Sequence, residues 1–214
     1  VGATMYMLAS NTRLQDTPPW PAWSEEIAPS WAGHTHYDLK QLFNDLEGLQ
    51  LQEDSKQNTY KLSYNVPLGA NRIRLLRILR KRLEDVGVKT NLIWSVDEHE
   101  QTYLLDILPA RAGKYHAIDF LRRHLDFSIK NTLFAGDSGN DLEVLVSPIH
   151  AVLVANSTKK IQTQARRLAK QKHRLDALYL AKGGFMGMNG NYSAGILEGI
   201  AHYLPQTRVW MGPA

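Results

Sequence analysis

Two aspartates lie close together in the stretch LFAGDSGNDLEVL, residues 133–145. Asp137 follows an apolar run, and Asp141 comes four positions later, with Ser138 and Asn140 between them. Carboxylates at the end of a buried strand lose hydration unless a partner compensates them. Two hard oxygen ligands with open positions suit Mg²⁺, which keeps several waters and shares the phosphate oxygens of a substrate. The loop therefore predicts a metal or phosphate site.

A helix N-cap is the simpler interpretation of an aspartate at this position, because Asp is a common N-cap residue. Two aspartates and an asparagine in one loop exceed what capping needs, so the metal or phosphate site is favoured. Lys114 is a second candidate, since it opens a predicted helix after PARAG. A lysine at a helix N-terminus is poorly placed against the helix dipole, and a bound phosphate would compensate it.

The first half of the chain predicts a small α+β sheet layer. Residues 13–33 are rich in proline and tryptophan and predict an irregular entry with a short helix, whose tryptophans serve packing. Apolar periodicity then predicts further elements: helices at 37–49 and 70–87, and strands at 59–66, 88–96 and 102–109.

The second half predicts a different architecture, in which strands and helices alternate. Strands that are apolar on both faces are typical of a parallel α/β sheet. Ligands bind at the carboxyl ends of such strands, where Asp137 lies. The predicted elements are helices at 114–127, 140–147, 158–170 and 191–204, and strands at 131–137 and 150–156.

Composition limits the possible classes of protein. The 214 residues are 43% hydrophobic, include no cysteine and carry a net charge of +4. The sequence shows neither an apolar run of 18 residues nor the pattern of a signal peptide, so we expect no membrane partner and a cytoplasmic location. Basic clusters at 72–82 and 159–174 are interpreted as solvated helix faces, and nucleic acid is not expected as a partner. The eight histidines are assigned to surface or packing positions.

GDSGND, with an upstream lysine that opens a helix and an α+β insert before it, resembles the haloacid dehalogenase superfamily of phosphatases. More closely, the sequence is similar to the sucrose-phosphate phosphatase family. The matching pieces are VGATMY, YKLSY, LLDILPARAGKYHAIDFL, LFAGDSGNDLEVL and NYSAGILEGIAHYLP. The last piece also resembles the phosphatase region at the end of some bacterial sucrose-phosphate synthases.

This resemblance implies a Rossmann-like parallel core, incomplete in this chain, with an α+β cap. It implies that residues 1–12 end the front part of the core, that 13–110 form the cap and that 111–214 form the rear part of the core. It also implies hydrolysis of sucrose 6-phosphate through an aspartyl-phosphate.

The resemblance also implies the roles of individual residues. Lys114 would hold the phosphoryl group, and Asp137 and Asp141 would hold Mg²⁺. Asn140 and Ser138 would contact the substrate, while Lys61 and Asp106 of the cap would bind sugar hydroxyls.

The first motif of the superfamily, Asp-x-Asp followed by Thr, does not occur in these residues, nor does the second motif, Thr/Ser-Gly-Arg. Both belong upstream of VGATMY, so the nucleophile is expected upstream of Val1 and this chain alone is expected to be inactive. A natural remnant without chemistry is the alternative. Lys114 precedes Tyr115 where the family usually has Gly, and Ala3 and Thr4 stand where it has a small hydroxyl residue and Glu.

Two functions from different classes follow. The first is a Mg²⁺-dependent sugar-phosphate phosphatase. The second is a non-catalytic sugar-phosphate-binding domain, linked to or associated with a sucrose-phosphate synthase. An Asp-x-Asp pair upstream of Val1 would discriminate between them.

Overall fold

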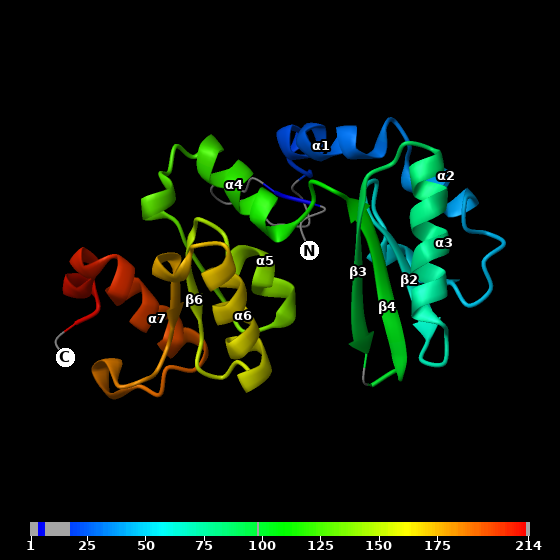
Figure 1. The fold of residues 1–214 in the computed structure, drawn as a ribbon. Helices are drawn as coiled ribbons and strands as arrows, with labels where there is room; N and C mark the ends of the chain where they lie inside the picture. The colour runs from blue at the N-terminus through cyan, green and yellow to red at the C-terminus, as the bar shows by residue number, and fades with distance from the viewer. Residues whose placement is uncertain (1–3, 7–17, 98, 213–214) are drawn as a thin grey trace. The chain divides into compact units, whose positions relative to one another are not determined.

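The computed structural model describes residues 4–6, 18–97 and 99–212, in two compact units. The first unit comprises residues 1–117 and the second comprises residues 118–214 (Figure 1). Most of the expected front part at 1–12, including Ala3, lies outside the described residues. The expected domain boundaries therefore stay a prediction.

The first unit contains an antiparallel sheet with the strand order β1-β2-β4-β3. Its strands are β1 (Gln50–Leu51), β2 (Leu62–Pro67), β3 (Thr90–Asp97) and β4 (Thr102–Pro109). In the register of β2 and β4, Leu62 faces Ile107 and Ser63 faces Asp106. Since successive side chains of a strand point to opposite faces, Leu62 and Ile107 lie on one face of the sheet, and Ser63 and Asp106 lie on the other.

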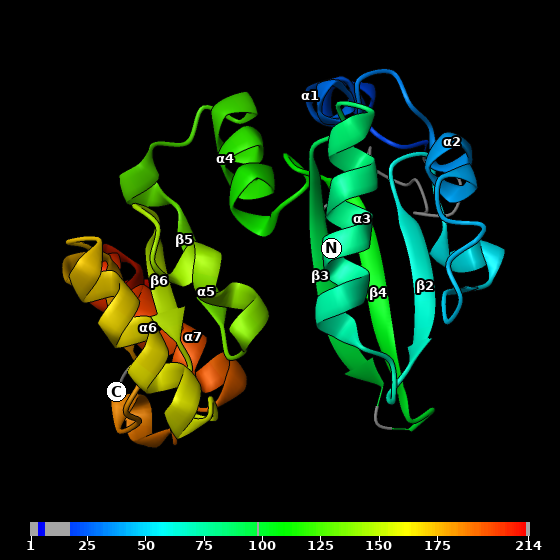
Figure 2. The same cartoon turned by 45° about the vertical axis from the view of Figure 1, so that its right-hand side comes forward.

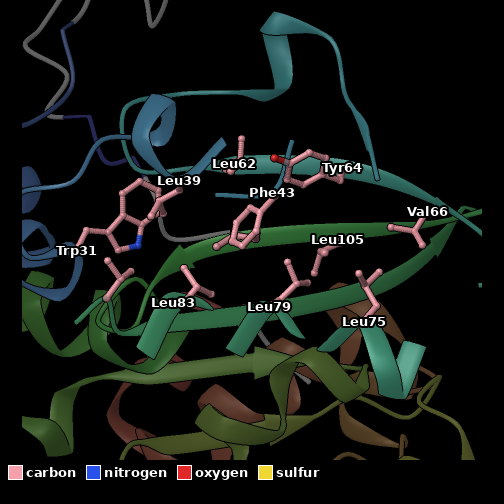
Figure 3. Close-up of a cluster of buried hydrophobic side chains, with 12 residues drawn as sticks. Trp31, Leu39, Phe43, Leu62, Tyr64, Val66, Leu75, Leu79, Leu83 and Leu105 are labelled. Carbon is pink, nitrogen blue, oxygen red and sulfur yellow. The ribbon is translucent and has the colours of Figure 1, made fainter. Parts of the chain in front are cut away.

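The apolar face of this sheet packs against α3 (Arg72–Asp85). Leu75, Leu79 and Leu83 recur at every fourth position of α3 and are buried against β2 and β4 (Figures 2 and 3). The Asn71 side chain accepts a bond from Arg74 N at 3.0 Å, which satisfies one of the free amides at the helix start. Gly87 then ends the segment with a φ of +74°.

The helix predicted at 37–49 is wrong in its second half. The helix α2 spans only His36–Gln41, and turns follow. Arg82 of α3 donates to the carbonyl of Leu42 and, at 2.7 Å, to the Asp45 carboxylate. The bond to the Leu42 carbonyl takes up an acceptor that a longer helix would use, while the leucines and Phe43 still reach the core. A tertiary contact has therefore overridden the apolar periodicity.

The strand predicted at 59–66 begins three residues late. Asn58 and Lys61 instead exchange two backbone bonds, of 3.2 and 3.1 Å, across a tight turn. The remaining helices of this unit are short: α1 (Pro21–Ile27), η2 (Ala28–Trp31) and η3 (Asp54–Lys56). Trp23, Ile27 and Trp31 are fully buried, which confirms the packing role predicted for Trp23 and Trp31.

The second unit contains a parallel sheet of order β5-β6-β7. Its strands are β5 (Leu133–Gly136), β6 (His150–Leu153) and β7 (Leu178–Leu180). The strand β7 was not predicted from the sequence, because three residues inside a mixed stretch give no periodicity. Its helices are the end of α4 (Lys114–His124), then η4 (Ile129–Asn131), η5 (Gly139–Asp141), α5 (Leu142–Leu145), α6 (Lys159–Gln171), η6 (Leu175–Ala177), η7 (Phe185–Gly187), α7 (Tyr192–Tyr203) and η8 (Pro205–Trp210).

Both faces of this sheet are covered by helices, with α6 and α7 on opposite sides of β6 (Figure 1). Ala151 and Leu153 pack toward α5 and α6, while Val152 lies on the α7 side. A Cβ on Gly199 of α7 would overlap the Val152 side chain. Glycine therefore lets α7 approach the strand closely, and the predicted parallel α/β core is confirmed. Within the described residues, none of the helices combines the length and apolar character needed to cross a bilayer.

Candidate active site

Residues 137–141, here called the aspartate loop, lie at the carboxyl end of β5, as predicted. One carboxylate oxygen of Asp141 organises it: Oδ2 accepts bonds from the amides of Asp137 and Ser138, both at 3.1 Å, and from the Ser138 hydroxyl at 2.9 Å. Only 5% of Asp141 is exposed. A buried carboxylate is tolerated when several donors replace its water. Asp141 therefore fixes the path of the loop in addition to any role toward a ligand.

Gly136 explains why the loop can close so tightly. A Cβ at this position would lie 2.6 Å from Cγ and Oδ2 of Asp141, which no real side chain could occupy. The glycine that ends β5 thus leaves the space into which the Asp141 carboxylate folds. The position of the Asp141 carboxylate in the loop therefore depends on glycine at the end of β5.

Asp137 differs from Asp141 in its environment. Asp137 is exposed, and its Oδ2 accepts a bond from Asn156 Nδ2 at 3.2 Å. The Oδ1 of Asn156 accepts from the amide of Tyr192 at 2.8 Å. Asn156 therefore connects the aspartate loop to the start of α7 and orients the Asp137 side chain.

Sequence reasoning missed Asn156, although a signal existed. It follows β6 closely, and the carboxyl ends of neighbouring parallel strands meet at one edge of a sheet. A polar residue there is placed beside the residue that ends β5. Asn140 is exposed on the same loop, whereas the Ser138 hydroxyl donates to Asp141. The substrate contacts of Asn140 and Ser138 stay predictions.

Lys61 and Asp106 come together in the first unit. Lys61 Nζ lies 3.4 Å from Asp106 Oδ1 and donates to the Lys56 carbonyl at 3.1 Å. Ser63 donates its hydroxyl to the same Asp106 oxygen at 2.6 Å. The Lys61 and Asp106 side chains are only 19% and 23% exposed. This polar cluster lies on the sheet face opposite α3, where hydroxyl groups of a ligand could form hydrogen bonds in place of those within the cluster.

Lys114 opens α4 in the first unit, whereas Asp137 and Asp141 belong to the second. The structure thus assembles the aspartate loop in one unit and the Lys61–Asp106 pair in the other. Thr4, which stands where the resemblance has an acid, accepts a bond from Asn58 Nδ2 at 3.2 Å. Asn58 precedes Lys61 in the turn that leads into β2.

A metal ion bound at the aspartate loop could be held by two carboxylates, those of Asp137 and Asp141. Within residues 4–6, 18–97 and 99–212, no group of three or more His, Cys, Asp and Glu side chains gathers in a geometry for metal binding. Carboxylate and amide oxygens suit Mg²⁺, which binds through one or two carboxylates and completes its shell with water and phosphate. The chemistry of the aspartate loop therefore fits this ion.

Glu198 is a buried carboxylate whose role was not predicted from the sequence. It accepts bonds from the Tyr179 hydroxyl at 2.7 Å and from the amides of Lys182 and Gly183, both at 2.9 Å. Burial alone would raise its pKa, but these three donors outweigh burial and lower it. Burial, together with the hydrogen bond to the Glu198 carboxylate and its charge, raises the pKa of Tyr179 to about 12. Glu198 therefore anchors the end of β7 to α7.

The fold is similar to that of solved structures that belong to one class of protein. A sucrose-phosphatase from Synechocystis, in complex with sucrose and phosphate, aligns with 86% of this chain and 67% of its own, with a TM-score of 0.63 and 24% identity. A haloacid dehalogenase-like hydrolase from Bacillus subtilis aligns with 94% of this chain and 65% of its own, with a TM-score of 0.55 and 18% identity. The fold is therefore that of the haloacid dehalogenase-like hydrolases, with a core and a cap as predicted.

The sequence narrows this class to a family. The sequence pattern of the sucrose-6F-phosphate phosphohydrolases matches residues 1–204, and the chain belongs to this family. It is 49% identical over 99% of its length to a protein of Nitrosococcus oceani described as a HAD-like hydrolase, and 31% identical over 72% to sucrose-phosphatase 1 of Nicotiana tabacum. The chain spans 56% of the first relative and 34% of the second.

Proposed function

We propose that this chain supplies the cap and the rear core of a Mg²⁺-dependent phosphatase that hydrolyses sucrose 6-phosphate to sucrose and phosphate. The observation that carries the proposal is the aspartate loop at the carboxyl end of β5, where Asp141 holds the loop and Asp137 faces solvent. Family membership and the sucrose and phosphate bound by the Synechocystis protein support the substrate class.

Asp137 and Asp141 would hold Mg²⁺, with Asn156 orienting the Asp137 carboxylate. When bound, the ion would neutralise the charge of the phosphoryl group. Lys114 would hold the phosphoryl oxygens through its ammonium group, and Asn140 and Ser138 would contact the substrate from the loop. Positioning and charge neutralisation are the main contributions that a protein makes to phosphoryl transfer.

The nucleophile in this proposal is an aspartate upstream of Val1. It attacks phosphorus, and the bond from phosphorus to the sucrose oxygen breaks while the second aspartate of the upstream Asp-x-Asp motif gives that oxygen a proton. Water then attacks the aspartyl-phosphate, loses a proton to the same aspartate and releases phosphate. Within the described residues β5 stands at one edge of the parallel sheet, with Asp137 at its carboxyl end. A strand that paired with this edge would bring its own carboxyl end beside Asp137, because parallel strands end at the same edge.

The cap would select the sugar. Lys61 and Ser63 both contact the same oxygen of Asp106, so the three side chains present donors and acceptors in fixed positions. Such groups suit sugar hydroxyls, because a hydroxyl that leaves water must find a partner in the site. Closure of a cap over the core would exclude water from the reacting group. Covalent linkage to, or association with, a sucrose-phosphate synthase domain is a further proposal, and so is a cytoplasmic location.

The test compares two proteins: this chain as given and a version extended upstream by the natural sequence. Phosphate release from sucrose 6-phosphate is followed with Mg²⁺ and with EDTA. We expect release only from the extended protein and only with Mg²⁺. If the extended protein binds sucrose 6-phosphate but releases no phosphate, the binding-domain alternative replaces the phosphatase.

A further inference from the structure

The described part of the segment rich in proline and tryptophan, residues 18–33, has no part in the proposed chemistry, yet it is firmly packed. It folds into α1 and η2, in which Trp23, Ile27 and Trp31 are all fully buried. One charged residue of α1, Glu26, is only one-quarter exposed. A carboxylate sheltered in this way needs partners, and its partners lie far away in the sequence.

Those partners flank Lys114. Nε2 of His116, two residues after Lys114, lies 2.7 Å from Glu26 Oε1. Arg111, three residues before Lys114, places Nη1 3.6 Å from the same oxygen. The Trp23 ring packs on the His116 ring, with 5.9 Å between centroids. Because an ionised carboxylate only accepts, Nε2 of His116 carries the proton in this bond.

The backbone before Lys114 is held as well. The amide of Arg111 donates to Ser30 Oγ at 3.3 Å, and the carbonyl of Ser30 accepts from Lys89 N at 2.7 Å. The amide of Ala110 donates to the Lys89 carbonyl at 3.0 Å, and Ala112 is fully buried. Residues 110–116 are thus attached to η2 and to the start of β3.

We propose that Glu26 is a positioning residue for Lys114. The inference rests on the proposed function, in which the Lys114 ammonium binds the phosphoryl group. A lysine has a long, flexible side chain, so the position of its ammonium depends on how firmly its Cα is held. Glu26 fixes the first turn of α4 through His116 and the preceding linker through Arg111.

A purely structural role for Glu26 makes a different prediction. If Glu26 only stabilised the fold, its removal would lower the free energy of unfolding and would leave phosphate affinity unchanged in the folded protein. If it positions Lys114, its removal weakens phosphate binding and raises KM, and these effects vanish once Lys114 itself has been removed. Coupling of this kind between two positions is what a double-mutant cycle measures.

The experiment uses the upstream-extended protein and five variants: Glu26→Ala, Glu26→Gln, Lys114→Ala, the double variant Glu26→Ala/Lys114→Ala, and Glu25→Ala. Glu25 is the matched control, because it lies beside Glu26 in α1 and is exposed. Three quantities are measured: the Kd of inorganic phosphate by calorimetry, kcat and KM for sucrose 6-phosphate, and unfolding in urea. His116→Asn removes the same contact from the other side if Glu26→Ala does not fold.

We expect Glu26→Ala to raise KM and the Kd of phosphate about tenfold, since small misplacements of a binding group are costly. Glu26→Gln should retain most of the affinity, because its amide oxygen still accepts from His116. The double variant should bind phosphate no more weakly than Lys114→Ala.

The inference is overturned if Lys114→Ala weakens phosphate binding while Glu26→Ala behaves like Glu25→Ala. It is also overturned if the loss of phosphate affinity in the double variant equals the sum of the losses, in free energy, of the two single variants. The proposed function fails in a different way, namely if Lys114→Ala leaves the Kd of phosphate unchanged. The two failures are therefore distinguishable.

Discussion

Substitutions of the two aspartates in the loop should differ in their effect on the free energy of unfolding, with a large loss for Asp141 and a small one for Asp137. Asp141→Ala removes the acceptor of two amides and one hydroxyl, inside a site where only 5% of the residue is exposed. Each donor left without a partner costs about 1–3 kcal/mol when water cannot replace the bond. Because Asp137 and Ser138 are partly accessible, we expect a total loss of about 2–4 kcal/mol in the free energy of unfolding.

Asp137→Ala should behave differently, because Asp137 is exposed and accepts one long bond from Asn156. Exposed substitutions of this kind change stability by about 0.5 kcal/mol or less. Urea unfolding of the upstream-extended protein, followed by circular dichroism, measures both values, with Glu143→Ala of α5 as an exposed control. Equal losses for Asp137→Ala and Asp141→Ala would refute the structural role of Asp141.

Three further outcomes are expected. Gly199→Ala should destabilise the protein by about 1–3 kcal/mol, because its Cβ would overlap Val152. The control Gly69→Ala should not destabilise the protein, because its Cβ would meet no atom within 4 Å. An unchanged urea midpoint for Gly199→Ala would contradict the close packing of α7 on β6. The lowered pKa of Glu198 means that its contribution to stability is present above its usual value of 4.5 and is lost as pH falls through the lower folded value. Urea midpoints measured from pH 7 to pH 3 should therefore fall less steeply for Glu198→Gln, from a lower starting stability, and parallel curves would argue against this role. Lys61→Ala should raise KM for sucrose 6-phosphate about 10- to 100-fold and leave KM for p-nitrophenyl phosphate unchanged, and equal effects on both substrates would remove Lys61 from sugar recognition.

The sequence predicted the parts of the fold that depend on local pattern. Leu75, Leu79 and Leu83 define α3 by their spacing alone, and the apolar stretch TYLLDILP predicted β4 with its observed bounds, Thr102–Pro109. The aspartate loop was predicted because it combines an apolar strand with two carboxylates in a short turn.

The parts that sequence reasoning missed depend on contacts between distant residues. Arg82 bonds to the Leu42 carbonyl forty residues away, and this contact accompanies the early end of α2. Asn156 and Glu198 look like ordinary polar residues in the sequence. Their roles follow from bonds to Asp137 and to Lys182, which only the folded chain brings near.

Mg²⁺-dependent phosphate release by the upstream-extended protein, with and without Asp137→Asn, tests the central claim most directly. Asp126→Asn is the matched control, because Asp126 is exposed in the same unit and its positive φ suits asparagine. The account predicts that Asp137→Asn abolishes phosphate release from sucrose 6-phosphate while the variant stays folded, and that Asp126→Asn retains full activity. Unchanged phosphate release by Asp137→Asn would contradict the assignment of the aspartate loop as the phosphatase site.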